Sequence, residues 1–221
     1  MLIHESVKGL NKLISKLNTL DLKQQDFTEN EFIVRKGESL QHFYWQTSVS
    51  SSNTAIQYIA ENGRNILFPS QNGEHRFYGE IETITSDPHL FDVIALEPIS
   101  LKVVPTSILL ELMRQEPDVA IWFANMVTKR YQQVVETSFS FLLHSHAINI
   151  AADIHFKHKN QQPLFCFKKQ ADEAARFGCS ERVYRRVLNQ LVQLEILQKS
   201  KSTYLLINAD KLTRFLANSQ Q

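Results

Sequence analysis

Three arginines stand close together near the C-terminus of this 221-residue chain, at positions Arg182, Arg185 and Arg186. A guanidinium group donates two hydrogen bonds in a fixed plane, which suits the O6 and N7 acceptors of guanine in the major groove of DNA. The neighbouring Glu181 can accept a hydrogen bond from the exocyclic amine of cytosine. These residue types are typical of a helix that enters a major groove, if the chain presents them on one face.

The predicted helix that carries these arginines also has an apolar back. Ser180 is placed to cap its start, because the hydroxyl can accept an otherwise unpaired backbone amide. A shorter helix is predicted at 170–177, and Gly178 gives the turn between the two helices the backbone freedom that it requires. The apolar stripe recurs at helical spacing and comprises Val183, Tyr184, Val187, Leu188, Leu191 and Leu194. Together these features predict a helix-turn-helix with a basic front.

A predicted β-hairpin follows, with strands at 195–199 and 203–207 joined by residues 200–202. A hairpin in this place makes the motif a winged helix. Four lysines are placed to meet phosphate, two on the wing and two before the first helix: Lys199, Lys201, Lys168 and Lys169. Any one of the arginines alone is more typical of a helical hairpin with a solvated basic face, whereas the combination of features favours DNA binding.

The distribution of charge supports this interpretation, although the net charge of the whole chain is only +1. Residues 150–221 contain 12 Lys and Arg against 6 Asp and Glu, whereas residues 1–149 contain 12 against 17. An acidic body joined to a basic C-terminal third is typical of a sensor attached to a module that binds a polyanion.

The rest of the chain predicts a β-rich domain between helices. An amphipathic helix is predicted over the first ~20 residues, and short apolar or alternating runs between residues 26 and 104 predict a β-sandwich or small barrel. The predicted strands include 31–34, 55–59, 65–68 and 100–104. A short helix at 107–113 follows Pro105, and a long one runs from 116 to about 144. The predicted domains are therefore a barrel domain (1–115), a connecting helix (116–146) and the winged helix (147–221).

One apolar stripe on the long helix falls near heptad spacing, at Phe123, Val127, Val134 and Phe141. The stripe predicts either a coiled-coil dimer interface or a helix that lies against its own barrel. A dimer is favoured because one helix-turn-helix reads few base pairs, and a second copy about a two-fold axis doubles the site.

Barrel, long helix and winged helix in this order resemble the superfamily of the cyclic-AMP receptor protein and the fumarate-nitrate regulator (CRP/FNR), over residues 25–215. In the barrel the resemblance lies in Lys36-Gly37-Glu38, Phe43-Tyr44, Asn62-Gly63-Arg64 and Phe77-Tyr78-Gly79-Glu80-Ile81-Glu82; in the C-terminal part it lies in Gly178-Cys179-Ser180, Arg186 and Tyr204-Leu205-Leu206-Ile207. The runs at 199–201 and 79–82 look most like the YeiL-like branch.

The resemblance implies an α+β chain: a cyclic-nucleotide-binding-like β-barrel of the jelly-roll (double-stranded β-helix) type, a dimerisation helix and a winged helix-turn-helix. It places the base-reading face at Glu181, Arg182 and Arg186, with Arg185 facing either base or phosphate. The DNA-binding set is thus Ser180, Glu181, Arg182, Arg185, Arg186, Lys168, Lys169, Lys199 and Lys201. Gly79, Glu80 and Asp92 are the expected sensor pocket.

Departures from the family pattern bear on the effector. Members that bind cyclic nucleotides follow the Gly-Glu turn with an arginine and a small hydroxyl residue that hold the cyclic phosphate. Here the corresponding stretch, 88–93, has no arginine and adds Asp92, so cyclic AMP and cyclic GMP are not expected and the effector is unknown. The two cysteines, Cys166 and Cys179, do not provide an iron–sulfur cluster. Glu173 stands where an apolar residue is commoner, which leaves the packing of the first motif helix open.

The partners expected are double-stranded DNA with a near-palindromic site and a second copy of the chain. The family also implies RNA polymerase, although residue spacing identifies no surface for it. A cytoplasmic protein is expected, without a membrane span, a metal site or enzymatic motifs. His155 and His158, at helical spacing, are interpreted as solvated or capping residues. The competing hypothesis is a ligand-sensing or interaction module whose basic wing contacts protein or RNA.

Overall fold

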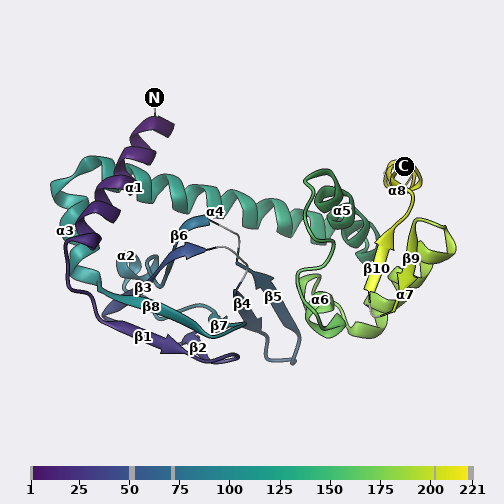
Figure 1. Ribbon diagram of the computed structural model, residues 1–221, viewed down its shortest axis with the longest axis horizontal. Coiled ribbons are helices and arrows are strands. Elements are labelled where there is room, and N and C mark those ends of the chain that lie inside the picture. The colour runs from purple at the N-terminus through teal and green to yellow at the C-terminus, as the bar shows by residue number, and fades with distance from the viewer. Residues whose placement is uncertain (1, 50–52, 71–72, 202, 219–221) are drawn as a thin grey trace. The chain divides into compact units, whose positions relative to one another are not determined.

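The computed structural model describes residues 2–49, 53–70, 73–201 and 203–218 (Figure 1). Ser202 of the predicted wing turn and the ends of the first and last predicted domains lie outside these ranges. The chain forms two compact units, Met1–Tyr58 with Phe68–Val135 and Ile59–Leu67 with Glu136–Gln221. The division between them falls within the long helix α4 (Pro117–Leu143), and each unit is described separately below.

Eight strands precede α4 in the described residues, and they belong to the first unit except for residues 59–67, which include the start of β5. They are β1 (Gln24–Phe27), β2 (Phe32–Val34), β3 (His42–Val49), β4 (Thr54–Ile59), β5 (Asn65–Pro69), β6 (Gly73–Tyr78), β7 (Asp92–Ala95) and β8 (Ile99–Pro105). They form two four-stranded sheets, in the orders β1-β8-β3-β6 and β2-β7-β4-β5. Because the first strand pairs with the last, the order is that of a jelly roll. The predicted barrel and its four named strands are confirmed.

Alternation along β3 divides the core of this unit into two layers, because successive strand side chains point to opposite faces. Phe43 and Trp45 join a cluster that includes Leu13 and Leu17 of α1 (Leu2–Asn18). Tyr44, between them in sequence, packs instead with residues such as Leu101 in a second cluster. The apolar face of the predicted N-terminal helix is therefore buried on the barrel.

Three helices cover or follow the strands of this unit. A single turn, α2 (Glu82–Thr85), follows β6, and α3 (Thr106–Gln115) follows β8. The predicted helices at 107–113 and from 116 onward correspond to α3 and α4. No helix in the described ranges is long and apolar enough to cross a membrane.

The predicted heptad stripe on α4 is not one exposed seam. Phe123 is buried in the first cluster, with Val127 packed against it. Phe141 packs on Phe177 of the second unit, with ring centroids 6.5 Å apart. Val134 is the stripe residue that lies exposed. The first part of the stripe therefore lies against its own barrel, one of the two predicted alternatives, and the dimer interface stays a prediction.

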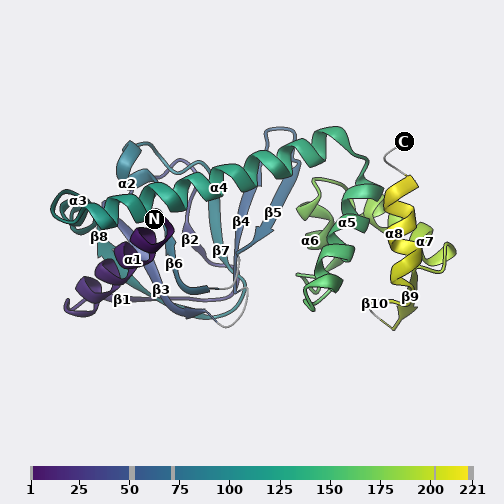
Figure 2. The same cartoon turned by 90° about the horizontal axis from the view of Figure 1, so that it is seen from above.

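The second unit contains four further helices and the wing. They are α5 (His146–Lys159), α6 (Gln170–Arg176), α7 (Glu181–Gln193), strands β9 (Leu197–Ser200) and β10 (Thr203–Leu206), and α8 (Ala209–Asn218). The strands pair antiparallel, with Lys199 opposite Tyr204. The sequence did not predict α8, which packs beside α5 and buries Leu212 in the core (Figure 2).

Candidate nucleic-acid interface

The turn between α6 and α7 is held as its sequence predicts. Gly178 adopts a φ of 59°, in the left-handed region that glycine enters without a steric penalty. Ser180 is extended, and its hydroxyl accepts the backbone amide of Val183 at 3.4 Å. The cap satisfies one of the amides that the first turn of α7 leaves unpaired. Sequence reasoning therefore located both ends of this turn.

The back of α7 is tightly packed. Tyr184 stacks on Phe177 with ring centroids 5.9 Å apart, and burial raises the pKa of the Tyr184 hydroxyl, which keeps it neutral. The other members of the predicted stripe that are buried are Val187, Leu188 and Leu191. Leu194 is 43% exposed, because α7 ends at Gln193 and Leu194 is its C-cap. Its place in the stripe was predicted wrongly.

The front of α7 is open. Arg182 and Arg186 are exposed, and neither makes an ion pair or a side-chain hydrogen bond within the described part of the chain. They border a shallow depression of about 690 Å³. The lining residues are Glu181, Arg182, Val183, Arg185, Arg186, Asn189, Gln190 and Gln193, all of them on α7. The helix thus presents guanidinium and amide groups together, which are the groups that bond to guanine and adenine edges.

Arg185 differs from the other two arginines because it already has partners. Its Nη2 lies 2.5 Å from Oε1 of Glu181, and its Nε donates to Oε1 of Gln170 at 2.9 Å. The second bond joins the start of α6 to α7. Glu181 and Arg185 therefore enter the site as a pair of opposite charges, while Arg182 and Arg186 remain free to bind an acceptor.

A buried charge network supports the helix-turn-helix, and it explains Glu173. This carboxylate is only 2% exposed; its Oε1 accepts the backbone amides of Cys166 and Phe167, and its Oε2 lies 2.8 Å from Nη1 of Arg176. Arg176 also forms a two-pronged pair with Asp153 of α5, at 2.7 and 3.1 Å. Glu173 replaces an apolar core residue with a charge whose bonds are satisfied.

The network continues into the loop before α6. Lys157 of α5 is buried; its Nζ lies 3.0 Å from Oδ2 of Asp153 and donates to the carbonyl oxygen of Leu164. One chain of contacts therefore joins α5, α6 and the loop. The sequence offered one clue to it, a charged residue at a core position, but gave no partner.

The predicted phosphate-binding lysines are exposed at two places. Lys168 and Lys169 stand at the start of α6, where Lys169 is the N-cap residue. Lys199 lies on β9 and Lys201 in the turn after it, with a φ of 45°. The role of these four lysines in binding phosphate stays a prediction.

The expected sensor pocket lies in the first unit, around the turn after β6. Gly79 has a φ of 85°, and a Cβ there would lie 3.1 Å from the ring of His89. Glu80 is 2% exposed, and Nη1 of Arg130, on α4, pairs with its Oε1. Burial raises the pKa of Glu80, and the arginine opposes that rise. Sequence reasoning assigned no role to Arg130, because it lies 50 residues away in the chain.

Two more residues near this turn, Asp92 and His89, also make contacts within the chain. Asp92, the third predicted pocket residue, accepts the backbone amide of Lys36 at 2.8 Å. His89 stands in the stretch where cyclic-nucleotide-binding members have arginine; it is buried, and its Nδ1 lies 3.4 Å from Oε2 of Glu82. Asp92 thus contacts the loop after β2, whereas Glu80 contacts α4.

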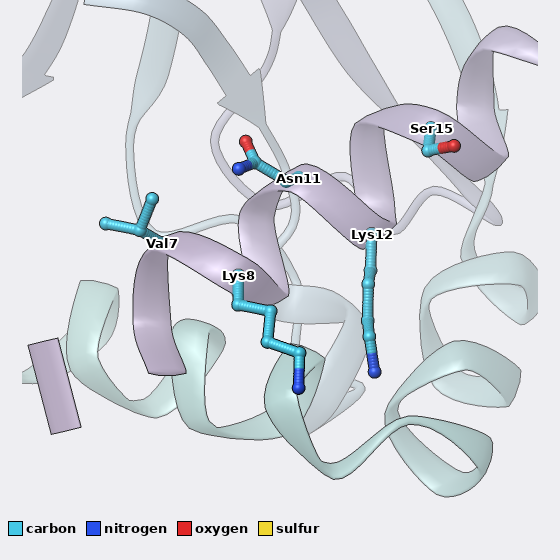
Figure 3. Close-up of a pocket in the computed structure, with 5 residues that line it drawn as sticks. All are labelled: Val7, Lys8, Asn11, Lys12 and Ser15. Atoms are coloured by element: carbon cyan, nitrogen blue, oxygen red, sulfur yellow. The ribbon is translucent and has the colours of Figure 1, made fainter. Parts of the chain in front are cut away.

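Two other groups of residues are weaker candidates for a functional site. A depression of about 410 Å³ on α1 is lined by Val7, Lys8, Asn11, Lys12 and Ser15 (Figure 3). Its two lysines already pair with Asp118, at 3.0 and 2.8 Å. His155 lies 3.3 Å from the hydroxyl of Thr213, and no group of three metal-binding side chains occurs in the described residues.

Comparison with known proteins identifies the fold of this chain. Residues 24–116 match the model of the cyclic nucleotide-binding domain family. The regulator CLP of Xanthomonas campestris, described as responsive to c-di-GMP, superposes with a TM-score of 0.69 at 15% identity, over 90% of this chain and 99% of CLP. The chain has the CRP/FNR fold. No curated protein sequence matches it significantly.

Two more solved structures have a similar fold over nearly the full chain. A regulator assigned to the CRP/FNR family from Eubacterium rectale gives a TM-score of 0.68 at 14% identity and covers 93% of both chains. FixK2 from Bradyrhizobium japonicum gives 0.63 at 14% identity, over 88% of this chain and 97% of FixK2. The predicted CRP/FNR resemblance and fold class are confirmed; the YeiL-like branch stays a prediction.

Proposed function

We propose that this protein is a sequence-specific, DNA-binding transcription regulator, and that α7 is its recognition helix. The observation that carries the proposal is the contrast between the two sides of α7. Its back is packed and its start is capped, while Arg182 and Arg186 project from its front without partners in the described chain. A rigid helix with unoccupied guanidinium groups is what direct readout of a major groove requires.

The residues divide into two roles. Arg182 and Arg186 bond to base edges, and each good two-pronged contact discriminates by about 1–3 kcal/mol. Glu181 is available to cytosine only if it exchanges its bond to Arg185 for one to the base. The lysines of the wing and of the start of α6 contact phosphate, which adds affinity that is blind to sequence and falls with salt.

The regulator acts as a homodimer through α4 and reads a near-palindromic site. Beyond the barrel contacts, α4 leaves large apolar side chains on its surface: Tyr131 is 68% exposed, Val134 64% and Leu142 79%. The three fall on one face of the helix, at spacings of three and eight residues. A second α4 packed on this face would remove them from water, and the two winged helices would then meet two half-sites.

The effector is not a cyclic nucleotide. A cyclic phosphate needs a cation, and the stretch where the family provides it holds His89, already beside Glu82. The next residue, Leu90, offers no hydroxyl, and Asp92 adds negative charge. Polymerase contact and the direction of regulation follow from neither unit.

Binding to a labelled random-sequence duplex across a salt series tests the DNA proposal. We expect log affinity to fall linearly with log salt, with a slope of about 0.9 per phosphate contact. The double variant Lys199→Ala/Lys201→Ala should reduce the slope by about 2. Lys23→Ala, an exposed lysine of the first unit, is the matched control and should leave it unchanged. A flat salt dependence, or a preference for RNA, would favour an interaction module instead.

Sedimentation of the Tyr131→Glu/Val134→Glu variant tests the dimer. Two carboxylates on the exposed face of α4 should shift the protein to a monomer and weaken binding to a two-half-site operator. Lys129→Glu, on another exposed part of the same helix, is the control and should remain dimeric. A dimer that survives the double substitution would place the interface elsewhere.

A further inference from the structure

A second depression, of about 310 Å³, lies beside α7 within the second unit. One wall is formed by α7 and the other by the junction of α4 and α5. The lining residues are Val183, Arg186, Val187 and Gln190 on the first wall and Phe141, His144, Ser145, His146 and Ala147 on the second. Among these described residues, three side chains can carry positive charge and none is a carboxylate. The depression therefore favours an anion.

The depression is continuous with the base-reading front. Val183, Arg186 and Gln190 line both hollows, so Arg186 stands on the ridge between the groove-facing surface and the histidine-lined flank. A major groove is about 12 Å wide, and a helix with its side chains is about 10–12 Å across. The flanks of an inserted helix must therefore face the sugar–phosphate strands. His144 and His146 lie on such a flank.

The junction that carries the histidines is fixed by its own backbone bonds. The amide of His144 donates to the carbonyl of Ser140 at 3.0 Å, and its carbonyl accepts from Nδ2 of Asn149 at 3.3 Å. Ser145 caps α5 by accepting the amide of Ile148. Both imidazoles are exposed, and within the described chain neither has a hydrogen-bond partner. The backbone therefore holds both histidines in place, and their imidazoles are available to a ligand.

We propose that this depression binds a phosphodiester of the DNA backbone, with His144 and His146 as its ligands beside Arg186. The inference rests on the proposed function, because it assigns a further contact to the same DNA complex. An imidazole acquires its proton, and with it a positive charge, as the pH falls from about 8 to about 5. The only other charged group lining the depression is Arg186, which is always cationic. DNA affinity therefore rises on acidification.

Anisotropy titrations with a random-sequence duplex, at constant ionic strength and at about pH 7.5 and about pH 6.0, test the proposal. We expect wild-type affinity to be roughly fivefold higher at the lower pH and the salt slope to be steeper by up to about 2. The double variant His144→Gln/His146→Gln should lose both changes. His144→Lys/His146→Lys, whose charges are fixed, should bind tightly at both pH values. His158→Gln, an exposed histidine of α5 outside the depression, is the control and should behave as wild type.

The outcomes separate the two proposals. If wild type binds DNA equally at both pH values, or if the glutamine variant keeps the pH dependence, the histidine site is wrong while the DNA-binding function stands. If wild type binds no DNA at either pH, both are wrong. If inorganic phosphate displaces DNA from wild type more strongly than chloride does, but not from the glutamine variant, the depression takes a free anion and the phosphodiester assignment is wrong.

Discussion

The front of α7 and the turn after β6 carry the two sets of residues that the CRP/FNR resemblance marks for ligands, and they differ in one respect. On α7, Arg182 and Arg186 have no partners within the described chain. Around the turn, Glu80 is paired with Arg130 and His89 lies beside Glu82. The first surface is ready for a partner, whereas at the second Glu80 already has one within its own unit; there, among the described residues, Nε2 of His89 is buried without a hydrogen-bond partner.

The difference bears on both proposals, DNA binding by α7 and an effector other than cyclic AMP or cyclic GMP. A base-reading helix needs donors that are unpaired before DNA arrives, since every internal bond must be broken first. The turn after β6 has Gly79 at a φ of 85° and a buried Glu80, and the charge of Glu80 is paired with Arg130. The shared fold therefore predicts the architecture better than it predicts the ligand.

The largest effect is expected on stability, from the buried charge network that supports α6 and α7. Arg176→Ala removes the cation that bridges Glu173 and Asp153, and it leaves two carboxylates inside the second unit. We expect the free energy of unfolding of that unit to fall by about 3–5 kcal/mol. Urea denaturation followed by circular dichroism measures the loss. Arg214→Ala, an exposed position on α8, should change stability by less than about 0.5 kcal/mol; equal losses in both variants would contradict the role given to the network.

A smaller effect is expected from pH, which should change the stability of the first unit through Glu80. Burial raises the pKa of Glu80 above its ordinary value of 4.5, so the folded state holds this proton more tightly than the unfolded chain does. The first unit should therefore lose stability as the pH rises from 4.5 through the raised pKa. Arg130→Ala removes the opposing cation and should extend this loss to higher pH.

Thermal unfolding of the first unit across that pH range checks the direction. Glu80→Gln cannot titrate and should flatten the dependence, while Glu29→Gln, an exposed control, should retain it. Stability that rises with pH in wild type, and not in Glu80→Gln, would show that the ion pair with Arg130 outweighs burial.

The smallest expected effect is that of cyclic AMP, for which the turn after β6 predicts none. A ligand present at 100 times its dissociation constant stabilises the folded state by about 2.7 kcal/mol, which raises the melting temperature by several degrees. With cyclic AMP at about 1 mM we expect a shift below about 1 °C. A saturable shift of several degrees would mean that His89 and Asp92 do not exclude the nucleotide.

Local patterns in the sequence predicted most of the fold and of the open site. The capped start of α7, the glycine turn and the buried Tyr184 follow from neighbours within a few residues, where periodicity and capping chemistry act. The error at Leu194 arose at a helix end, where spacing no longer determines burial. Helix α8 was missed although it follows the wing directly.

Contacts between distant residues were not predictable in the same way. The partner of Glu80, Arg130, lies 50 residues away in the sequence, and Arg176 and Asp153 are 23 residues apart. Only the packing of sheets and helices brings such groups together. The different surroundings of Phe123 and Phe141 have the same origin, since each residue contacts a different core.

Selection of bound fragments from random duplex DNA, with wild type and Arg186→Ala, tests the central claim most directly. We expect wild type to select a near-palindromic motif and the variant to lose preference at one base in each half-site, by about 1–3 kcal/mol, while weak nonspecific binding persists. Arg185→Ala, whose guanidinium already bonds to Glu181 and Gln170, should alter the motif less. An unchanged motif in Arg186→Ala, or no motif for wild type, would contradict the assignment of α7 as the base-reading helix.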